Sequence, residues 1–182
     1  MLKFTATVII NIRQENQEDY GITEKLIQEA FHNAEFSNHK EHLLVQKLRA
    51  TEGFIPKLSL VAESDNQIVG HILFTKVNIE GSKTKESLAL APLSVLPSAQ
   101  RQGIGSRLMK YGLERAKELG FESVIVLGHP EYYQRFGFIK ASIWNVQFPG
   151  DVPDEVFMAL ELNEDALIDA AGIVRYPSAF TE

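Results

Sequence analysis

Apolar positions along the chain switch between the two-residue spacing of strands and the three-to-four-residue spacing of helices. Residues 7–13 are rich in β-branched side chains and predict a first strand. Two segments with helical spacing follow, one beginning near Asp19 or Thr23 and one over about 40–50. We expect the first of these helices to bury one apolar face, made of Ile22, Leu26, Ile27, Ala30 and Phe31.

Strand patterns dominate the middle of the chain. Residues 58–63 and 67–77 flank a polar turn at 64–66, which predicts an antiparallel hairpin. A polar loop over 80–85 then precedes an apolar strand over 88–96. These segments predict three strands in succession.

A long amphipathic segment, 103–119, ends at Gly120, a residue that commonly closes helices. Residues 121–127 form a nearly continuous apolar run, as expected for a strand buried on both faces. The remaining elements are a short helix over 131–136, a loosely alternating segment over 138–148, a strand over 155–161 and weak helix potential over 164–171. The order is β-α-α-β-β-β-α-β-α-β-β, with one parallel βαβ unit and hairpins elsewhere, so we expect a mixed α/β (α+β) sheet.

The composition narrows the function classes. A chain of 182 residues, 45% hydrophobic and 23% charged, suits a single soluble domain over 1–182. The absence of cysteine excludes disulfides, thiol nucleophiles and thiolate metal sites. The net charge of −6 argues against general nucleic-acid binding and mildly favours a cationic acceptor. Without a membrane-spanning run or a signal-peptide cleavage pattern, we expect a cytoplasmic protein with no membrane partner.

The polar turn Gln-Arg-Gln-Gly-Ile-Gly at 100–105 lies where the long helix begins. The first turn of a helix offers unpaired N–H groups and the positive end of its dipole, so it suits a phosphate. Gly103 and Gly105 would let the backbone approach that anion closely. The glycine spacing fits neither a dinucleotide fingerprint nor an NTPase phosphate loop. By itself, the turn could equally start a helix without any ligand.

Pro92 lies inside the apolar strand over 88–96. Because proline has no N–H for the ladder, it predicts a bulge or a local parting from one neighbouring strand. A parted strand would leave backbone groups lining a slot beside the start of the helix, where α/β sheets usually bind ligands. An extended amide-bearing ligand could enter that slot with its phosphates at the helix start.

Two motifs resemble the GNAT superfamily of acetyl-CoA-dependent N-acetyltransferases. Residues 100–105 fit its Gln/Arg-x-x-Gly-x-Gly/Ala signature, and Tyr-Gln-Arg-Phe-Gly-Phe at 133–138 resembles its Tyr-x-x-x-Gly-Phe element. Residues 92–97 and 128–133 are similar to the YhbS-like subgroup of small bacterial acetyltransferases.

The resemblance covers the element order over about 7–162, with 163–182 as a C-terminal extension of one acetyltransferase domain. It implies a mostly antiparallel sheet of about seven strands with helices on both faces. It implies acetyl transfer from the cosubstrate acetyl-CoA to a small-molecule or peptide amine, by direct attack in a ternary complex, and it allows a homodimer. The alternatives are a non-catalytic acyl-CoA sensor or interaction module on the same fold, and a generic α/β binding module.

Carried onto this chain, the resemblance implies that the loop and the helix start hold the pyrophosphate of coenzyme A. The implied cofactor-binding residues are Leu93, Ser94, Val95, Gln100, Arg101, Gln102, Gly103, Ile104, Gly105, Ser106 and Tyr133. The backbone of 93–95 would pair with the pantetheine arm. The Leu93 N–H would donate to the thioester oxygen as negative charge grows there, a contribution typically worth roughly 3–4 kcal/mol.

Tyr133 is implied as the general acid that protonates the departing thiolate, because a neutral phenol is a donor at pH 7. The four-residue step to Gly137 selects Tyr133 over Tyr132, and the alternative is a core aromatic residue. Many family members carry an asparagine where this chain has Gly128-His129. His129 either replaces that contact or packs in the turn.

The acceptor pocket is expected between the first two helices, their connection and the last strands. The candidates for the base that deprotonates the amine are Glu35, His39, Glu41, His42 and His71. Glu41 is the preferred base because it lies near the start of the second helix, and the alternative is a solvated helix carboxylate. The aromatic residues that either line the pocket or complete the core are Phe54, Trp144, Phe148 and Tyr176. No third ligand accompanies His39 and His42, so we expect no metal.

Overall fold

The computed structural model describes residues 9–35 and 37–181, and within them nine strands form one sheet. The strands are β1 (Ile10–Gln14), β2 (Phe54–Ser64), β3 (Gln67–Gly81), β4 (Thr84–Val95), β5 (Ser123–Leu127), β6 (Ile139–Lys140), β7 (Val146–Gln147), β8 (Phe157–Glu161) and β9 (Gly172–Arg175). The helices are α1 (Tyr20–Phe31), α2 (Glu41–Leu48), α3 (Ile104–Glu118) and α4 (Pro130–Tyr133), with short 3-10 turns between elements. Residues 7 and 8 of the expected first strand lie outside the described residues. None of the described helices has the length and apolar character needed to cross a bilayer.

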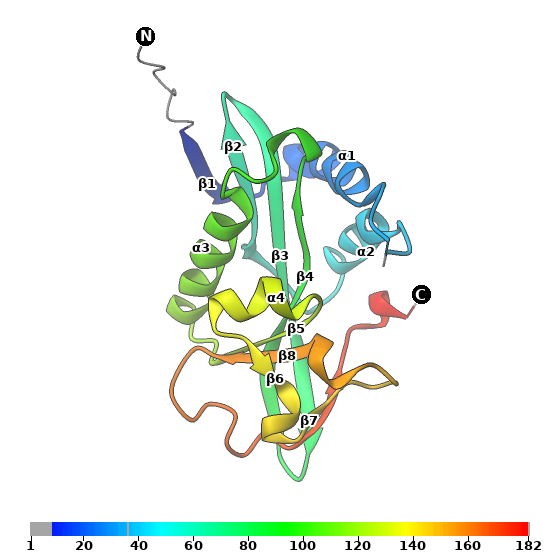
Figure 1. Ribbon diagram of the computed structural model, residues 1–182, viewed down its shortest axis with the longest axis vertical. Coiled ribbons are helices and arrows are strands. Elements are labelled where there is room, and N and C mark those ends of the chain that lie inside the picture. The colour runs from blue at the N-terminus through cyan, green and yellow to red at the C-terminus, as the bar shows by residue number, and fades with distance from the viewer. Residues whose placement is uncertain (1–8, 36, 182) are drawn as a thin grey trace.

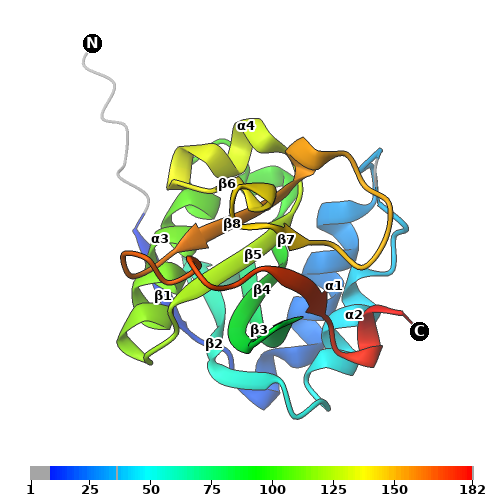
Figure 2. The same ribbon diagram turned by 90° about the horizontal axis from the view of Figure 1, so that it is seen from below.

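The sheet is mixed and mostly antiparallel. Its main path runs β1-β2-β3-β4-β5-β8-β6, and β9 joins it by pairing with β3 and β7. Only the pairs β4–β5 and β7–β9 are parallel among the described strands. Helix α3 covers one face, and α1 and α2 cover the other (Figures 1 and 2). The predicted fold class is confirmed, with seven strands on the main path and two short additional strands.

Helix α3 packs on the sheet through residues at helical spacing. Ile104, Leu108, Met109 and Ala116 are buried in the main core, as the sequence pattern predicts. The expected glycine cap is also present, because Gly120 has a φ of +88° and its N–H donates to the Lys117 carbonyl oxygen at 3.0 Å. Because Ile104 is the first residue of α3 and is buried, the start of the helix lies against the main core.

Gly112, on the buried face of α3, allows the helix to lie against Phe74 of β3. A Cβ at this position would lie 2.5 Å from the Phe74 Cε2 atom. We expect Gly112→Ala to lower the free energy of unfolding by about 1–3 kcal/mol, because the extra methyl group overpacks the core. Urea unfolding measures the change. Gly21→Ala is the matched control, since among the described residues an added Cβ at that position in α1 would meet no atom within 4 Å beyond its chain neighbours and its own helix backbone. Equal stability of the two variants would contradict the prediction.

Two expectations about the N-terminal and hairpin segments are wrong. Ile22 is 53% exposed, whereas Leu26 and Ile27 are buried. The reason is that α1 turns the smaller Thr23 toward the sheet, where its hydroxyl donates to buried Glu15. The expected loop over 80–85 is instead a tight hairpin, because the β3–β4 ladder continues to the pair Glu80↔Thr84.

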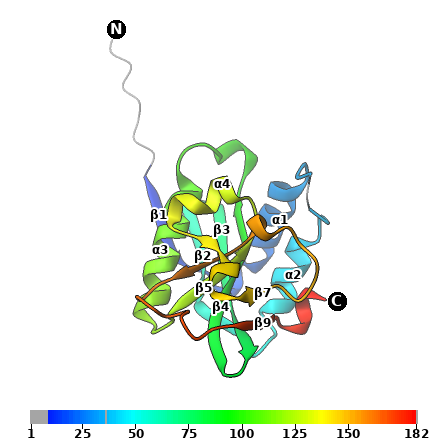
Figure 3. The same ribbon diagram turned by 60° about the horizontal axis from the view of Figure 1, so that its bottom comes forward.

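The tail also differs from its prediction. Residues 164–171 form turns in place of the weakly predicted helix, and β9 follows them. Strand β9 pairs antiparallel with β3, and Val174 is fully buried opposite Ile79. Ladder hydrogen bonds and apolar burial therefore outweigh a weak local helix propensity. Figure 3 shows β9 beside β7, with the C-terminal segment passing next to α2.

Candidate active site

Strand β4 is bulged at Pro92 and parts from β5. Between the register pairs Ile72↔Leu93 and Phe74↔Leu90, β4 contains one residue more than β3. The parallel ladder with β5 has only two register pairs, both before Pro92. Beyond that point β5 continues along β8. The bulge and the local parting predicted from Pro92 are both present, and one edge of β4 is left without β5.

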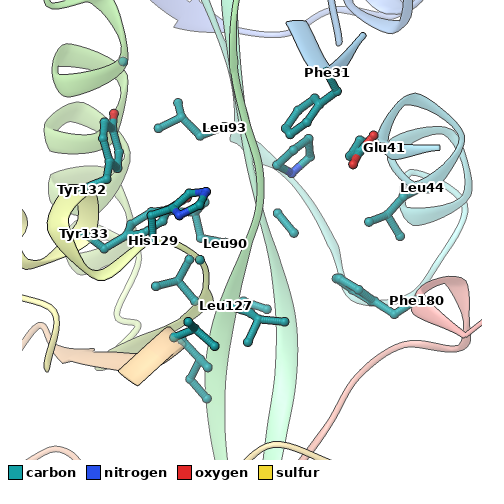
Figure 4. A pocket seen from close by; sticks show the side chains of 18 of the residues that line it. Phe31, Glu41, Leu44, Leu90, Leu93, Leu127, His129, Tyr132, Tyr133 and Phe180 are labelled. Carbon is teal, nitrogen blue, oxygen red and sulfur yellow. The ribbon is translucent and has the colours of Figure 1, made fainter. Parts of the chain in front are cut away.

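A cleft of about 2040 Å³ lies at this parting, lined by residues from both helical layers. Figure 4 shows β4 running between its two sides. The α3 side, named for its helix, contains Leu90, Leu93, Leu127, His129, Tyr132 and Tyr133. The α2 side contains Phe31, Glu41, Leu44 and Phe180. Nine of the eleven predicted cofactor-binding residues line the cleft, and Ser94 and Gln102 do not.

The loop before α3 is built from left-handed backbone. Gly103 has a φ of +78° and Arg101 a φ of +63°, and both line the cleft. Gln100 is anchored, since its side-chain amide donates to the Val95 carbonyl oxygen at 3.1 Å. At Gly105 an added Cβ would lie 2.8 Å from the Tyr132 hydroxyl oxygen, so a side chain at this position would require Tyr132 to shift. Gly103 is thus favoured by the backbone conformation, and Gly105 by the close approach of the Tyr132 side chain.

Tyr133 is positioned by the residues that follow it in its motif. Gly137 adopts a φ of +95° and ends the short turn after α4. This reversal places Phe138 in the core, where it is fully buried, with its ring centroid 5.8 Å from that of Tyr133. Burial raises the pKa of Tyr133, and the neighbouring Tyr132 raises it further. The phenol therefore stays protonated through the neutral range.

The departure at Gly128 has a steric explanation that the sequence did not reveal. A Cβ there would lie 2.5 Å from the Tyr133 Cε2 atom, so the ring occupies the space that a side chain would take. His129 is exposed and lines the cleft. Arg135 was also missed. Its guanidinium carbon lies 4.5 Å from the Tyr132 ring centroid, and the residue lines the cleft.

Of the five candidate bases, only Glu41 lines the cleft. The Ser37 hydroxyl donates to its Oε1 atom, while Oε2 is buried and has no hydrogen-bond partner among the described residues. Glu35 and His39 are exposed. No group of three or more histidine and carboxylate side chains gathers as a metal site in residues 9–35 and 37–181.

His71 belongs to a buried polar cluster outside the cleft. Its Nε2 atom lies 3.6 Å from the Glu15 carboxylate and 3.2 Å from the Ser59 hydroxyl oxygen. Burial alone would raise the pKa of Glu15, but interactions with His71, Ser59 and Thr23 outweigh burial and lower it to about 2. Since neither His71 nor Glu15 lines the cleft, His71 is not a candidate for the base.

Of the aromatic residues considered for the pocket, Phe148 and Tyr176 line the cleft. Phe54 and Trp144 do not line the cleft, and they pack against core clusters. Phe31, Leu44 and Phe180 were missed as lining residues, and no local pattern marks them.

The model of the acetyltransferase (GNAT) family matches residues 14–138. The chain belongs to this family. It is 42% identical over 104 residues to the uncharacterized N-acetyltransferase YjhQ of Escherichia coli (strain K12), a match that covers 57% of this chain and 58% of YjhQ. It is 33% identical over 146 residues to the uncharacterized N-acetyltransferase YhbS of the same strain, covering 80% of this chain and 86% of YhbS.

Two solved GNAT structures extend the comparison. The structure of YhbS from Escherichia coli in complex with CoA has a TM-score of 0.87 at 27% identity, and the alignment covers 100% of this chain and 97% of the other. A GNAT family acetyltransferase from Brucella melitensis, in complex with acetyl-CoA, has a TM-score of 0.78 at 34% identity, covering 94% and 98%. The resemblance inferred from the two motifs is confirmed, and this chain is an acyltransferase.

Proposed function

We propose that this acetyltransferase moves an acetyl group from acetyl-CoA to an amine by direct attack in a ternary complex. The observation that carries the proposal is the parted edge of β4, which faces Tyr133 and ends at the glycine loop of α3. The complexes of its structural neighbours with CoA and acetyl-CoA support the choice of cosubstrate.

The α3 side fits coenzyme A along its length. Backbone N–H groups of residues 102–106, with the exposed guanidinium of Arg101, bind the pyrophosphate at the positive end of α3. The edge of β4 at 93–95, left without β5, pairs with the amides of the pantetheine arm. The same pairing brings the Leu93 N–H to the thioester oxygen, where it stabilises developing negative charge.

Acetyl-CoA supplies an activated acetyl group, and the chain's own residues manage the protons. Glu41 accepts a proton from the acceptor ammonium, which frees the nitrogen lone pair for the thioester carbon. The new N–C bond forms as the C–S bond breaks, and the sulfur takes the Tyr133 phenol proton. The second proton of the attacking nitrogen passes to the Tyr133 phenolate, which leaves a neutral amide, free CoA and a restored phenol. Since the chain has no cysteine, no thiol can carry the acetyl group between the two substrates.

Calorimetric titration with acetyl-CoA tests the cosubstrate, and a matched pair of arginine variants tests its placement. We expect Arg101→Ala to weaken binding about tenfold or more, because it removes a charge-assisted hydrogen bond to phosphate. Arg107→Ala, also exposed and in the first turns of α3 but outside the cleft, should leave affinity unchanged. No heat of binding at millimolar acetyl-CoA would rule out the cosubstrate, and equal losses in both variants would rule out the placement.

A further inference from the structure

The α2 side of the cleft has an apolar wall. Its apolar and aromatic lining residues are Phe31, Leu44, Phe148, Val152, Tyr176 and Phe180. They come from the end of α1, from α2, from the segment before β8 and from the C-terminal segment. Because a lone ammonium needs no such wall, this surface indicates that the acceptor carries an apolar body.

This wall is held in place by packing. Ring centroids are 5.8 Å apart between Phe148 and Tyr176, and 4.9 Å apart between Tyr176 and Phe180. Phe31, Leu44 and Phe180 pack against the same core cluster beneath α1 and α2. Burial raises the pKa of Tyr176, so its hydroxyl remains neutral and adds no charge to the wall. The surface is therefore preorganised for apolar contact.

Most of the charged residues that line the cleft are basic, although the whole chain has a net charge of −6. Glu41 is the only carboxylate among the described lining residues. Five basic residues also line the cleft, namely Lys40, Lys47, Arg101, Arg135 and Arg175. The buried Oε2 atom of Glu41 lacks a hydrogen-bond partner among the described residues. One ammonium group on the acceptor would donate a hydrogen bond to it. A second cationic group on the acceptor would meet Lys40 and Lys47 on the α2 side, whereas Arg101 is assigned to the pyrophosphate and Arg175 is paired with Glu80.

Resting on the proposed acetyl transfer, we infer that the acceptor is a monoamine on an apolar body, either an aromatic ring or a branched aliphatic group. Its ammonium lies at Glu41, and its apolar part lies against Leu44, Tyr176 and Phe180. Polyamines and aminoglycosides are excluded by the same arrangement, because each brings several cations and little apolar surface to this wall.

A panel of amines with saturating acetyl-CoA tests the inference by release of free CoA. We expect kcat/KM for 2-phenylethylamine and isopentylamine to exceed that for spermidine and kanamycin by about a hundredfold or more. In a series from propylamine to pentylamine, kcat/KM should rise about fourfold with each methylene group. Higher kcat/KM for spermidine or kanamycin would overturn the acceptor class while leaving acetyl transfer intact. Turnover of none of the amines would overturn the transfer itself, and the acceptor class with it.

A variant of the wall separates acceptor binding from folding. Leu44→Gln should raise KM for 2-phenylethylamine about tenfold or more, because an amide replaces an apolar contact. Its affinity for acetyl-CoA, measured by calorimetry, should stay at the wild-type value and report an intact fold. Ile22→Gln, an exposed position on α1 outside the cleft, is the matched control and should leave KM unchanged. An unchanged KM in Leu44→Gln would overturn the proposed wall.

Discussion

Replacement of Tyr133 by phenylalanine is expected to lower kcat a hundredfold or more. In the proposed reaction the departing thiolate takes the phenol proton, and general acids typically contribute about 10² to 10⁴ in rate. The ring stays in place because its packing against Phe138 and the space left by Gly128 do not involve the hydroxyl group. Affinity for acetyl-CoA should therefore change less than about twofold. Steady-state kinetics and calorimetry on the same preparation measure both quantities.

Two further tyrosines provide the controls. Tyr132→Phe removes the hydroxyl next to Gly105 and tests whether the neighbouring phenol is the acid. Tyr111→Phe alters an exposed residue of α3 outside the cleft and should have no effect. Because the pKa of Tyr133 is raised, its proton is retained as the pH rises, and kcat should show no alkaline loss from this group below about pH 10. A larger loss of kcat in Tyr132→Phe than in Tyr133→Phe would reassign the acid.

The glycine motifs could be found from the sequence because each encodes a backbone requirement in a single residue. Gly103 and Gly137 both adopt positive φ, a conformation that few other residues take readily. Pro92 could be interpreted in the same way, since a missing N–H has only a few structural consequences within a sheet. Local covalent chemistry thus located the start of α3, the bulge in β4 and the position of Tyr133.

The α2 side of the cleft could not be predicted to the same degree. In the sequence, Phe31 and Leu44 are recognisable only as helix residues and Phe180 only as a residue of the tail. Long-range packing brings the three together against one core cluster. Strand β9 has the same origin, because its pairing with β3 joins segments about a hundred residues apart in the chain. The sequence indicated Glu41 as a base only through its place near the start of the second helix. Its unpartnered carboxylate oxygen is a property of the folded chain.

The largest expected loss of stability lies in the cluster around Glu15, at the end of β1. Its carboxylate accepts hydrogen bonds from the Ser59 hydroxyl at 2.6 Å, from the Thr23 hydroxyl at 2.5 Å and from Arg49 Nη2 at 2.7 Å. The side chain of Glu15 is fully buried, and that of Arg49 is 6% exposed. One carboxylate therefore joins α1, the segment after α2, and β2.

We expect Glu15→Gln to lower the free energy of unfolding by about 3 kcal/mol or more. Removal of one partner leaves the Arg49 charge largely buried, with Glu24 as its remaining carboxylate contact at 2.6 Å. Urea unfolding at pH 7 measures the loss. Glu80→Gln is the matched control, because its ion pair with Arg175 at 2.8 Å is solvent-exposed, and such pairs are worth about 1 kcal/mol or less.

The pH dependence of this loss identifies charge as its cause. Glu15 has a folded-state pKa of about 2, against an ordinary value of 4.5, so its ionised form stabilises the fold above pH 4.5 and that contribution disappears as the pH falls through 2. The stability gap between wild type and Glu15→Gln should therefore be full at pH 7 and fall to about half or less near pH 3. A gap that stayed constant from pH 7 to pH 3 would contradict this account. A constant gap would mean that the loss comes from packing and hydrogen-bond geometry. Those contacts are missing in Glu15→Gln at every pH, whether the wild-type carboxylate is ionised or protonated.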